Sequence, residues 1–290
     1  MVALDCLKSW PGVMIATDMP AQTISTSGRR SRSLSLRTDA YPGNFASAIR
    51  AAAELNAAGV QIDARNHFRP SELSDTAIRQ LRKMLDDLDL RVTAVRFPTR
   101  RGYDVAEGLE ARIDATKAAM RLAHRLDCPT VINSAGNIPD AQTQSDAYEQ
   151  MTQVIDDLGR AGTHLGAFLA VETDGQDPQI LDALLSSTTD GYVAVCLNPG
   201  RLIINRHSVP AAVKTFGSRI ASVSVVDGVI DLAAGRGIEV PLGQGIADFG
   251  EIVAHLQQHH YSGDFAIGRS DTTVGELRTD AQYMQTILAG

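Results

Sequence analysis

Short apolar segments alternate about eight times with segments whose apolar residues recur at helical spacing. The apolar segments have the length of strands and cover residues 33–37, 60–63, 91–97, 130–133, 168–172, 192–198, 220–227 and 265–269. Continuous apolar runs are typical of parallel strands covered by helices. We therefore predict an α/β fold of the (β/α)8 TIM barrel type. An open doubly wound sheet is the alternative, but no glycine-rich dinucleotide turn follows an early strand.

Capping residues mark several of the predicted helices. Asn44 precedes the apolar residues at helical spacing that mark the first predicted helix, and Gly59 follows the end of that helix. Asp248 precedes Phe249, with Glu251 at the position that completes a capping box. The helix after the second strand is expected to run roughly from residue 72 to 88.

The composition, charge and cysteine content indicate which binding partners and which cellular compartment to expect. Of the 290 residues, 44% are hydrophobic and 21% are charged, and no apolar run is long enough to cross a bilayer, so no membrane partner is expected. The net charge of −7 gives no general attraction to nucleic acid. Cys6, Cys128 and Cys196 are far apart and odd in number, which predicts buried, reduced thiols in a cytoplasmic protein.

The first 32 residues precede the repeating pattern. Asp5 and the short apolar run at residues 13–16 do not match an export signal. Residues 23–32 are rich in Ser, Thr and Arg, which is typical of an exposed connection. We expect residues 1–32 to form an N-terminal extension, packed on the barrel or exposed as a loop, and residues 33–290 to form a single barrel domain.

Glu172 is the predicted catalytic residue. It ends the apolar segment Phe-Leu-Ala-Val-Glu, and Asn198 ends the following one. Groups at the carboxyl ends of parallel strands face the mouth of a barrel, where α/β folds keep their sites. A carboxylate neutralised by a loop arginine is the alternative interpretation.

Arginines are frequent at the ends of the predicted strands and in the loops that follow. The residues predicted to bind the ligand are Arg65, Arg96, Arg100, Arg101, Asn198, His207, Asp227 and Arg269. Arginine binds carboxylate or phosphate through two parallel hydrogen bonds, so this set predicts an anionic or heavily hydroxylated ligand. Salt bridges to nearby carboxylates are the alternative role for several of these arginines. His207 has a second possible role as a helix cap.

A glycine-rich segment at residues 235–245 precedes the Asp248 cap. Its glycines would let the backbone approach a ligand, and the helix terminus that follows would favour an anion. Many long loops are rich in glycine, so the segment is only a weak indication of a phosphate site.

The chain resembles the xylose-isomerase-like superfamily of TIM barrels, a group of sugar-phosphate isomerases and epimerases that also includes endonuclease IV. The resemblance is carried, in order, by segments 59–65, 170–172, 197–200, 219–227 and 240–249. It implies a barrel from about the first strand to the last helix. It also implies a small carbohydrate-like ligand, and the oligomeric state is left open with a homodimer as one option.

The family also implies a metal site. Its members typically hold a divalent metal with a glutamate after strand five, an aspartate after strand six, a histidine in strand seven and a glutamate after strand eight, and the two glutamates exchange protons with the substrate. Glu172 matches the first position, but Asn198, Ser224 and Gly268 occupy the others. One carboxylate and one amide are poor ligands for a tightly held metal, so we expect no cofactor, with Mn, Zn or Mg as the alternative.

Three functions follow as hypotheses. In the first, the chain acts as an isomerase or epimerase on a hydroxylated carbonyl compound, with Glu172 as the base and arginines stabilising the enediolate. In the second, a divergent barrel binds a sugar or sugar acid without turnover. The third, nucleic-acid repair, is disfavoured by the lost ligand positions and the acidic charge balance. The sequence predicts an isomerase-like barrel with a degraded metal site and leaves catalysis open.

Overall fold

The computed structural model describes residues 33–233 and 235–289. The predicted N-terminal extension and Cys6 lie outside these residues. Cys128 and Cys196 are buried and free, as the sequence predicted. No helix in the described ranges combines the length and the apolar character that crossing a membrane requires.

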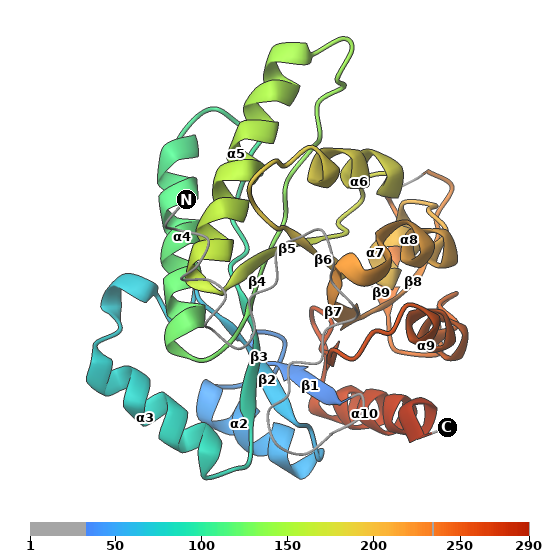
Figure 1. Ribbon diagram of the computed structural model, residues 1–290. Helices are drawn as coiled ribbons and strands as arrows, with labels where there is room; N and C mark the ends of the chain where they lie inside the picture. Colours follow the sequence, from blue (N-terminus) through green and yellow to red (C-terminus); the bar gives the residue numbers. More distant parts are fainter. Residues whose placement is uncertain (1–32, 234, 290) are drawn as a thin grey trace. The chain divides into compact units, whose positions relative to one another are not determined.

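Eight parallel strands close into a barrel, which confirms the predicted fold (Figure 1). Going around the barrel, the order is β1-β10-β7-β6-β5-β4-β3-β2, so neighbours in sequence are neighbours in space. The barrel strands are β1 (Leu34–Arg37), β2 (Gly59–Asp63), β3 (Arg91–Arg96), β4 (Thr130–Asn133), β5 (Phe168–Glu172), β6 (Ala194–Leu197), β7 (Ile220–Val225) and β10 (Phe265–Ile267).

Helices lie around the outside of the barrel (Figure 1). They are α2 (Phe45–Glu54), α3 (Asp75–Asp86), α4 (Leu109–Arg125), α5 (Ser145–Leu165), α6 (Pro178–Ser186), α7 (Pro199–Ile204), α8 (Val209–Phe216), α9 (Phe249–Gln258) and α10 (Val274–Ala289). Short 3-10 turns occur at Pro70–Glu72 and Gly217–Arg219.

Asn44 and Asp248 cap their helices as predicted, whereas the first helix ends at Glu54, before Gly59, and the next helix starts later than expected. Asn44 accepts a hydrogen bond from the Ser47 N–H, and Asp248 accepts one from the Glu251 N–H. The helix expected from residue 72 begins later, at Asp75. The reason is local: residues 70–72 form a 3-10 turn, and Ser74 then caps the α-helix by accepting from the Ala77 N–H.

Side chains on the two faces of the barrel strands form separate clusters. The larger cluster fills the space between strands and helices, whereas the smaller one consists of Ala94, Ile132, Ala170, Ala194 and Cys196. These residues alternate along their strands with members of the larger cluster, so they point into the barrel. Three of the five are alanines, which leaves space in the interior for longer polar side chains.

Three elements near the ends of β6 and β7 were not predicted: a short helix and two paired strands. Residues 199–204, for which the sequence analysis named no helix, form helix α7, because Asn198 caps it by accepting from the Arg201 N–H and Pro199 fits its first position. The connection after the predicted strand 220–227, for which no further strand was named, includes the antiparallel pair β8 (Asp227–Val229) and β9 (Ile238–Val240).

Candidate functional site

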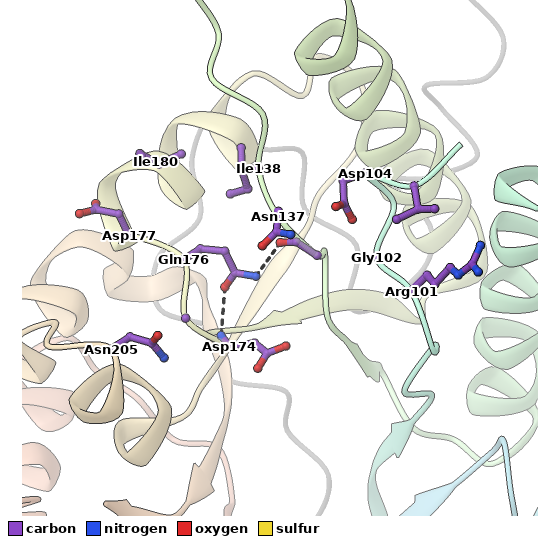
Figure 2. Close-up of a pocket in the computed structure, with 13 residues that line it drawn as sticks. Arg101, Gly102, Asp104, Asn137, Ile138, Asp174, Gln176, Asp177, Ile180 and Asn205 are labelled. Carbon is purple, nitrogen blue, oxygen red and sulfur yellow. Dashed lines mark hydrogen bonds between the residues drawn. The ribbon is translucent and has the colours of Figure 1, made fainter. Parts of the chain in front are cut away.

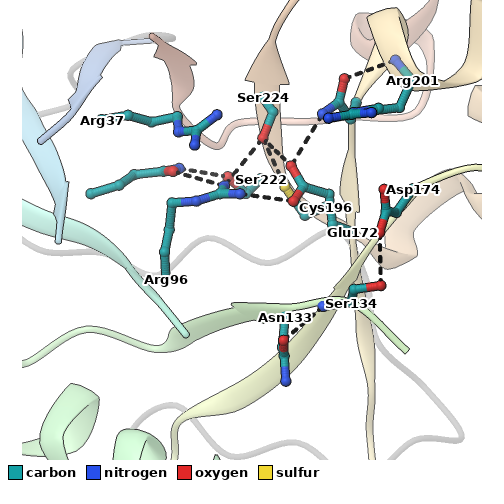
Figure 3. A network of polar contacts seen from close by, with 12 residues as sticks. Arg37, Arg96, Asn133, Ser134, Glu172, Asp174, Cys196, Arg201, Ser222 and Ser224 are labelled. Atoms are coloured by element: carbon teal, nitrogen blue, oxygen red, sulfur yellow. Dashed lines mark hydrogen bonds and ion pairs between the residues drawn. The ribbon is translucent and has the colours of Figure 1, made fainter. Parts of the chain in front are cut away.

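The Glu172 carboxylate lies at the end of β5 and faces three hydrogen-bond donors. Arg96 at the end of β3 donates from Nη2 to Oε2 at 2.7 Å. Oε1 accepts from Ser224 Oγ at 2.9 Å and from Asn198 Nδ2 at 3.2 Å. β5 is not adjacent to β3 or β7, so the Arg96 and Ser224 contacts reach across the barrel interior (Figure 3).

Arg96 is the buried cation of this network. Its side chain is 7% exposed and that of Glu172 is 15% exposed, so water screens the ion pair poorly. Nη1 lies 3.4 Å from both Gln61 Oε1 and Ser224 Oγ, while buried Nε has no hydrogen-bond partner among residues 33–233 and 235–289. The strong contact of Arg96 is therefore the one with Glu172.

The ion pair holds both groups in their charged forms. Burial raises the pKa of Glu172, but the charges of Arg96 and Arg37 and hydrogen bonds from Ser224 and Arg96 outweigh burial and lower it from 4.5 to about 2. Burial lowers the pKa of Arg96, but the charges of Glu172 and Asp39 raise it above its ordinary value overall. Glu172 is thus a very weak base.

A second ion pair neighbours the first. Arg37 at the end of β1 donates from Nη2 to Asp39 Oδ2 at 2.8 Å, and their side chains are 13% and 19% exposed. Burial raises the pKa of Asp39, but Arg37 and the charge of Arg96 lower it from 3.8 to about 2. The two pairs together carry two positive and two negative charges, so the group is neutral overall.

Asn198 and Ser224, two of the residues matched to the family's metal ligands, both contact Glu172 as hydrogen-bond donors. Asn198 Oδ1 accepts from the Arg201 N–H at 3.1 Å, so the amide NH2 faces Glu172. Ser224 donates its hydroxyl to the same carboxylate, and Gly268 has no side chain. No group of three or more His, Cys, Asp or Glu side chains in the described part of the chain is arranged to hold a metal ion.

The side chains that contact Glu172 present donor groups to it rather than ligand atoms for a metal. Every neighbour of the Glu172 carboxylate named above is a hydrogen-bond donor, and the buried guanidinium of Arg96 is its counter-ion. A Cβ at Gly268 would lie 2.9 Å from the Cβ atoms of Ala40 and Arg37, and the residue has φ +128. The position matched to the second glutamate therefore disfavours any side chain.

The other predicted ligand-binding residues lie apart from Glu172. Arg65 donates to the Pro98 carbonyl at 2.7 Å, Arg101 pairs with Glu107, and Arg269 pairs with Glu276 at 2.9 Å. His207 Nδ1 is 4.0 Å from Asp177 Oδ2, and exposed Arg100 has no recorded partner among the described residues. The structure brings only Arg96 and Asn198 of the predicted set to Glu172.

Asp227 is fully buried, and its carboxylate binds backbone N–H groups of the glycine-rich loop and its neighbours. Oδ1 accepts from the N–H groups of Gly228 and Ala247, and Oδ2 accepts from those of Gly243 and Gly245. A Cβ at Gly245 would lie 2.1 Å from Asp227 Oδ1, which is why glycine is needed there. The loop that resembled an anion site therefore binds an internal carboxylate.

An open cavity of about 560 Å³ lies beside this network, between the loops that follow β3, β4, β5 and β6 (Figure 2). We call it the loop cavity. Its polar lining includes Arg101, Asp104, Asn137, Asp174, Gln176 and Asp177. Neither Glu172 nor the other positions matched to the family's metal ligands lines it. Asp174 lines the cavity and follows Glu172 by only two residues, so the cavity lies next to the ion pairs (Figure 3).

Two sets of residues in this region were not singled out from the sequence. Asp39 lies two residues after Arg37, the last residue of β1. This short spacing could have indicated the ion pair between them. Asp104 and Asp174 were visible in exit loops, but nothing in the sequence showed that these loops share a cavity.

Comparison with known proteins identifies the family. The family described as "Xylose isomerase-like TIM barrel" matches residues 49–286, most of the chain. The chain belongs to this family. No curated protein matches the sequence significantly.

Solved structures of xylose isomerase-like barrels share the fold. A xylose isomerase domain protein from Planctomyces limnophilus has 18% identity and a TM-score of 0.76, covering 90% of this chain and 96% of that one. D-psicose 3-epimerase, solved in the presence of D-fructose, has 16% identity and a TM-score of 0.70, covering 89% and 100%. A Mycobacterium smegmatis protein of the family, solved in complex with magnesium, has 16% identity and a TM-score of 0.68, covering 89% and 96%.

Proposed function

We propose that this barrel binds a small carbohydrate-like ligand at the carboxyl ends of its strands and lacks the two-carboxylate proton exchange typical of its family. The ion pair between Arg96 and Glu172 carries this proposal. An efficient general base has a pKa near the operating pH, whereas the pKa of Glu172 is about 2. Gly268 supplies no second base on the other side of the site.

The ligand class is supported by the family, and its charge is argued from the ion pairs. D-psicose 3-epimerase and L-ribulose 3-epimerase are among the similar structures. Arg37, Arg96, Arg101 and Arg269 each have a carboxylate partner, so they offer little net positive charge to an anion. This argues against the anionic ligand that the arginines suggested, and Asp227 is assigned to its loop rather than to the ligand.

Catalysis by Glu172 is the alternative. The observation in its favour is that a carboxylate and a guanidinium lie side by side at a strand exit, as a base and an enediolate-stabilising cation would. Such a route requires a ligand that separates the ion pair and raises the pKa of Glu172.

Ligand-observed NMR in D2O tests both functions at once. D-Fructose, D-psicose and L-ribulose are incubated with the protein and with Glu172→Gln, and both binding and deuterium incorporation next to the carbonyl are followed. We expect binding without exchange above the protein-free rate. Exchange that disappears in Glu172→Gln would establish catalysis instead, and absence of binding to all three sugars would contradict the proposal.

The same samples test the metal. Added Mn²⁺, Zn²⁺ or Mg²⁺ should change neither the exchange rate nor the melting temperature, because the Glu172 carboxylate already has a buried counter-ion. Near-stoichiometric metal in the purified protein, lost in Glu172→Ala, would contradict the degraded metal site.

A further inference from the structure

The loop cavity has the size of a small-molecule site. Its volume of about 560 Å³ lies within the range of roughly 300–1,000 Å³ that is usual for ligand pockets. Its walls come from four consecutive exit loops, and Gln176 ties two of them together (Figure 2). Gln176 accepts from the Asp174 N–H at 3.0 Å and donates to the Gly136 carbonyl at 2.9 Å.

The polar groups left free in the loop cavity are mostly acceptors. Neither carboxylate oxygen of Asp104 has a recorded hydrogen-bond partner among the described residues, and Asp174 uses only Oδ2, which accepts from Ser134 at 2.9 Å. Asp177 Oδ1 accepts a hydrogen bond from the Gln179 N–H of helix α6. Arg101, the cationic side chain of the lining, is paired with Glu107 outside it.

Asp104 packs closely against two glycines. A Cβ at Gly136 would lie 2.1 Å from Asp104 Oδ1, and one at Gly102 would lie 2.4 Å from it. The two glycines therefore let the carboxylate pack against the backbone of two loops. The carboxylate therefore lies on the wall of the cavity, close to the backbone of both loops.

We propose that the loop cavity binds a polyhydroxylated ligand that carries a protonated amine, as an amino sugar does. Carboxylates accept hydrogen bonds from hydroxyl groups, and an ammonium group supplies three donors and the opposite charge. A phosphate or carboxylate on the ligand would instead meet three carboxylates and one arginine that is already paired. This inference rests on the proposed carbohydrate-like ligand and adds its location and charge.

Three probes with one pyranose frame test the charge preference. D-Glucosamine, D-glucose and D-glucose 6-phosphate are titrated by ligand-observed NMR at a pH at which the amine is protonated. We expect glucosamine to bind at least about fivefold more tightly than glucose, and glucose 6-phosphate to bind most weakly.

Two variants test the location. Asp104→Asn and Asp174→Asn should each weaken glucosamine binding more than glucose binding. Asp114→Asn makes the same change at an exposed position on α4 outside the cavity lining and should alter neither.

The outcomes separate the two proposals. Sugar binding without a preference for the amine, or with a preference for the phosphate, would overturn this inference and leave the proposed function standing. An amine preference that survives both cavity variants would overturn the location. Absence of binding to all three probes would overturn the inference and count against the proposed function as well.

Discussion

At the scale of single residues, Arg96 decides what Glu172 can do. A carboxylate at the end of β5 would be a plausible ligand or base if it faced water, but Arg96, Ser224 and Asn198 supply three donors. The resulting ion pair is only slightly exposed, so neither partner can be removed without leaving a buried charge.

A double-mutant cycle measures this dependence. Glu172→Gln and Arg96→Met should each lower the free energy of unfolding by about 3 kcal/mol, because each leaves its partner unpaired. The double variant should lose less than the sum of the two, by about 1 kcal/mol or more. Urea unfolding provides the measurement, and additive losses would mean that the pair contributes no coupling.

Gly268 occupies the position matched to the family's second glutamate, and its surroundings limit which side chains can stand there. Gly268→Glu is expected to destabilise the protein by about 2 kcal/mol, because φ is +128 and the new Cβ would approach Arg37 and Ala40. Gly268→Ala is the matched control and should lose a similar amount, since the Cβ causes the cost. If Gly268→Glu instead kept its stability and bound Mn²⁺ by calorimetry, the steric argument would be wrong.

At the scale of elements, the loop after β9 closes on Asp227. Four backbone N–H groups converge on its two oxygens. Many backbone donors around one carboxylate form an anion site, and here the chain supplies its own anion. The loop is thereby fixed against the end of β7.

Asp227→Asn tests that role. The amide has one acceptor oxygen and would place N–H groups against backbone donors, so we expect a loss of about 2–3 kcal/mol in the free energy of unfolding. Asp231→Asn, on the exposed part of the same connection, should change it by less than about 0.5 kcal/mol. Equal effects of the two variants in urea unfolding would contradict the assignment.

Helix α10 carries a pH-dependent contact with the same loop. Burial raises the pKa of Asp280 from 3.8 to about 6, and the hydrogen bond from the Leu242 N–H only partly offsets it. A raised carboxyl pKa contributes stability that is complete below 3.8 and is lost as pH rises through 6.

Asp280→Asn cannot lose this stability by ionising. The unfolding free energy of the variant, relative to the original chain, should therefore rise by about 1–2 kcal/mol between pH 4 and pH 7. Parallel urea titrations across this range measure the difference. A difference that is independent of pH would show that Asp280 does not titrate in this window.

At the scale of the whole molecule, each strand pairs with the next one along the chain and β10 closes on β1. Residues 33–290, produced without the first 32, should therefore fold as a complete barrel. Their melting temperature should lie within about 4 °C of that of the full chain, corresponding to roughly 1 kcal/mol. Calorimetry of both chains tests this expectation, and an unfolded or aggregated shorter chain would show that residues 1–32 are part of the core.

The sequence predicted the elements well where local patterns decide them. Apolar runs located all eight barrel strands, and Asn44 and Asp248 marked the starts of their helices. It missed α7 and the β8–β9 pair, because a helix of six residues and two paired strands of three residues leave little periodicity to detect. It placed Glu172 at the mouth, since the end of a parallel strand fixes that position.

The sequence by itself determined the barrel, the strand exits and the residue types at Asn198, Ser224 and Gly268, because these depend on residue type and short-range order. Only the tertiary structure decided which charges meet. Arg96 and Glu172 are far apart in the chain, and no local pattern could show that they pair, or that the exit loops holding Asp104 and Asp174 enclose one cavity. Pairing and enclosure depend on distances across the barrel mouth, which exist only after closure of the sheet.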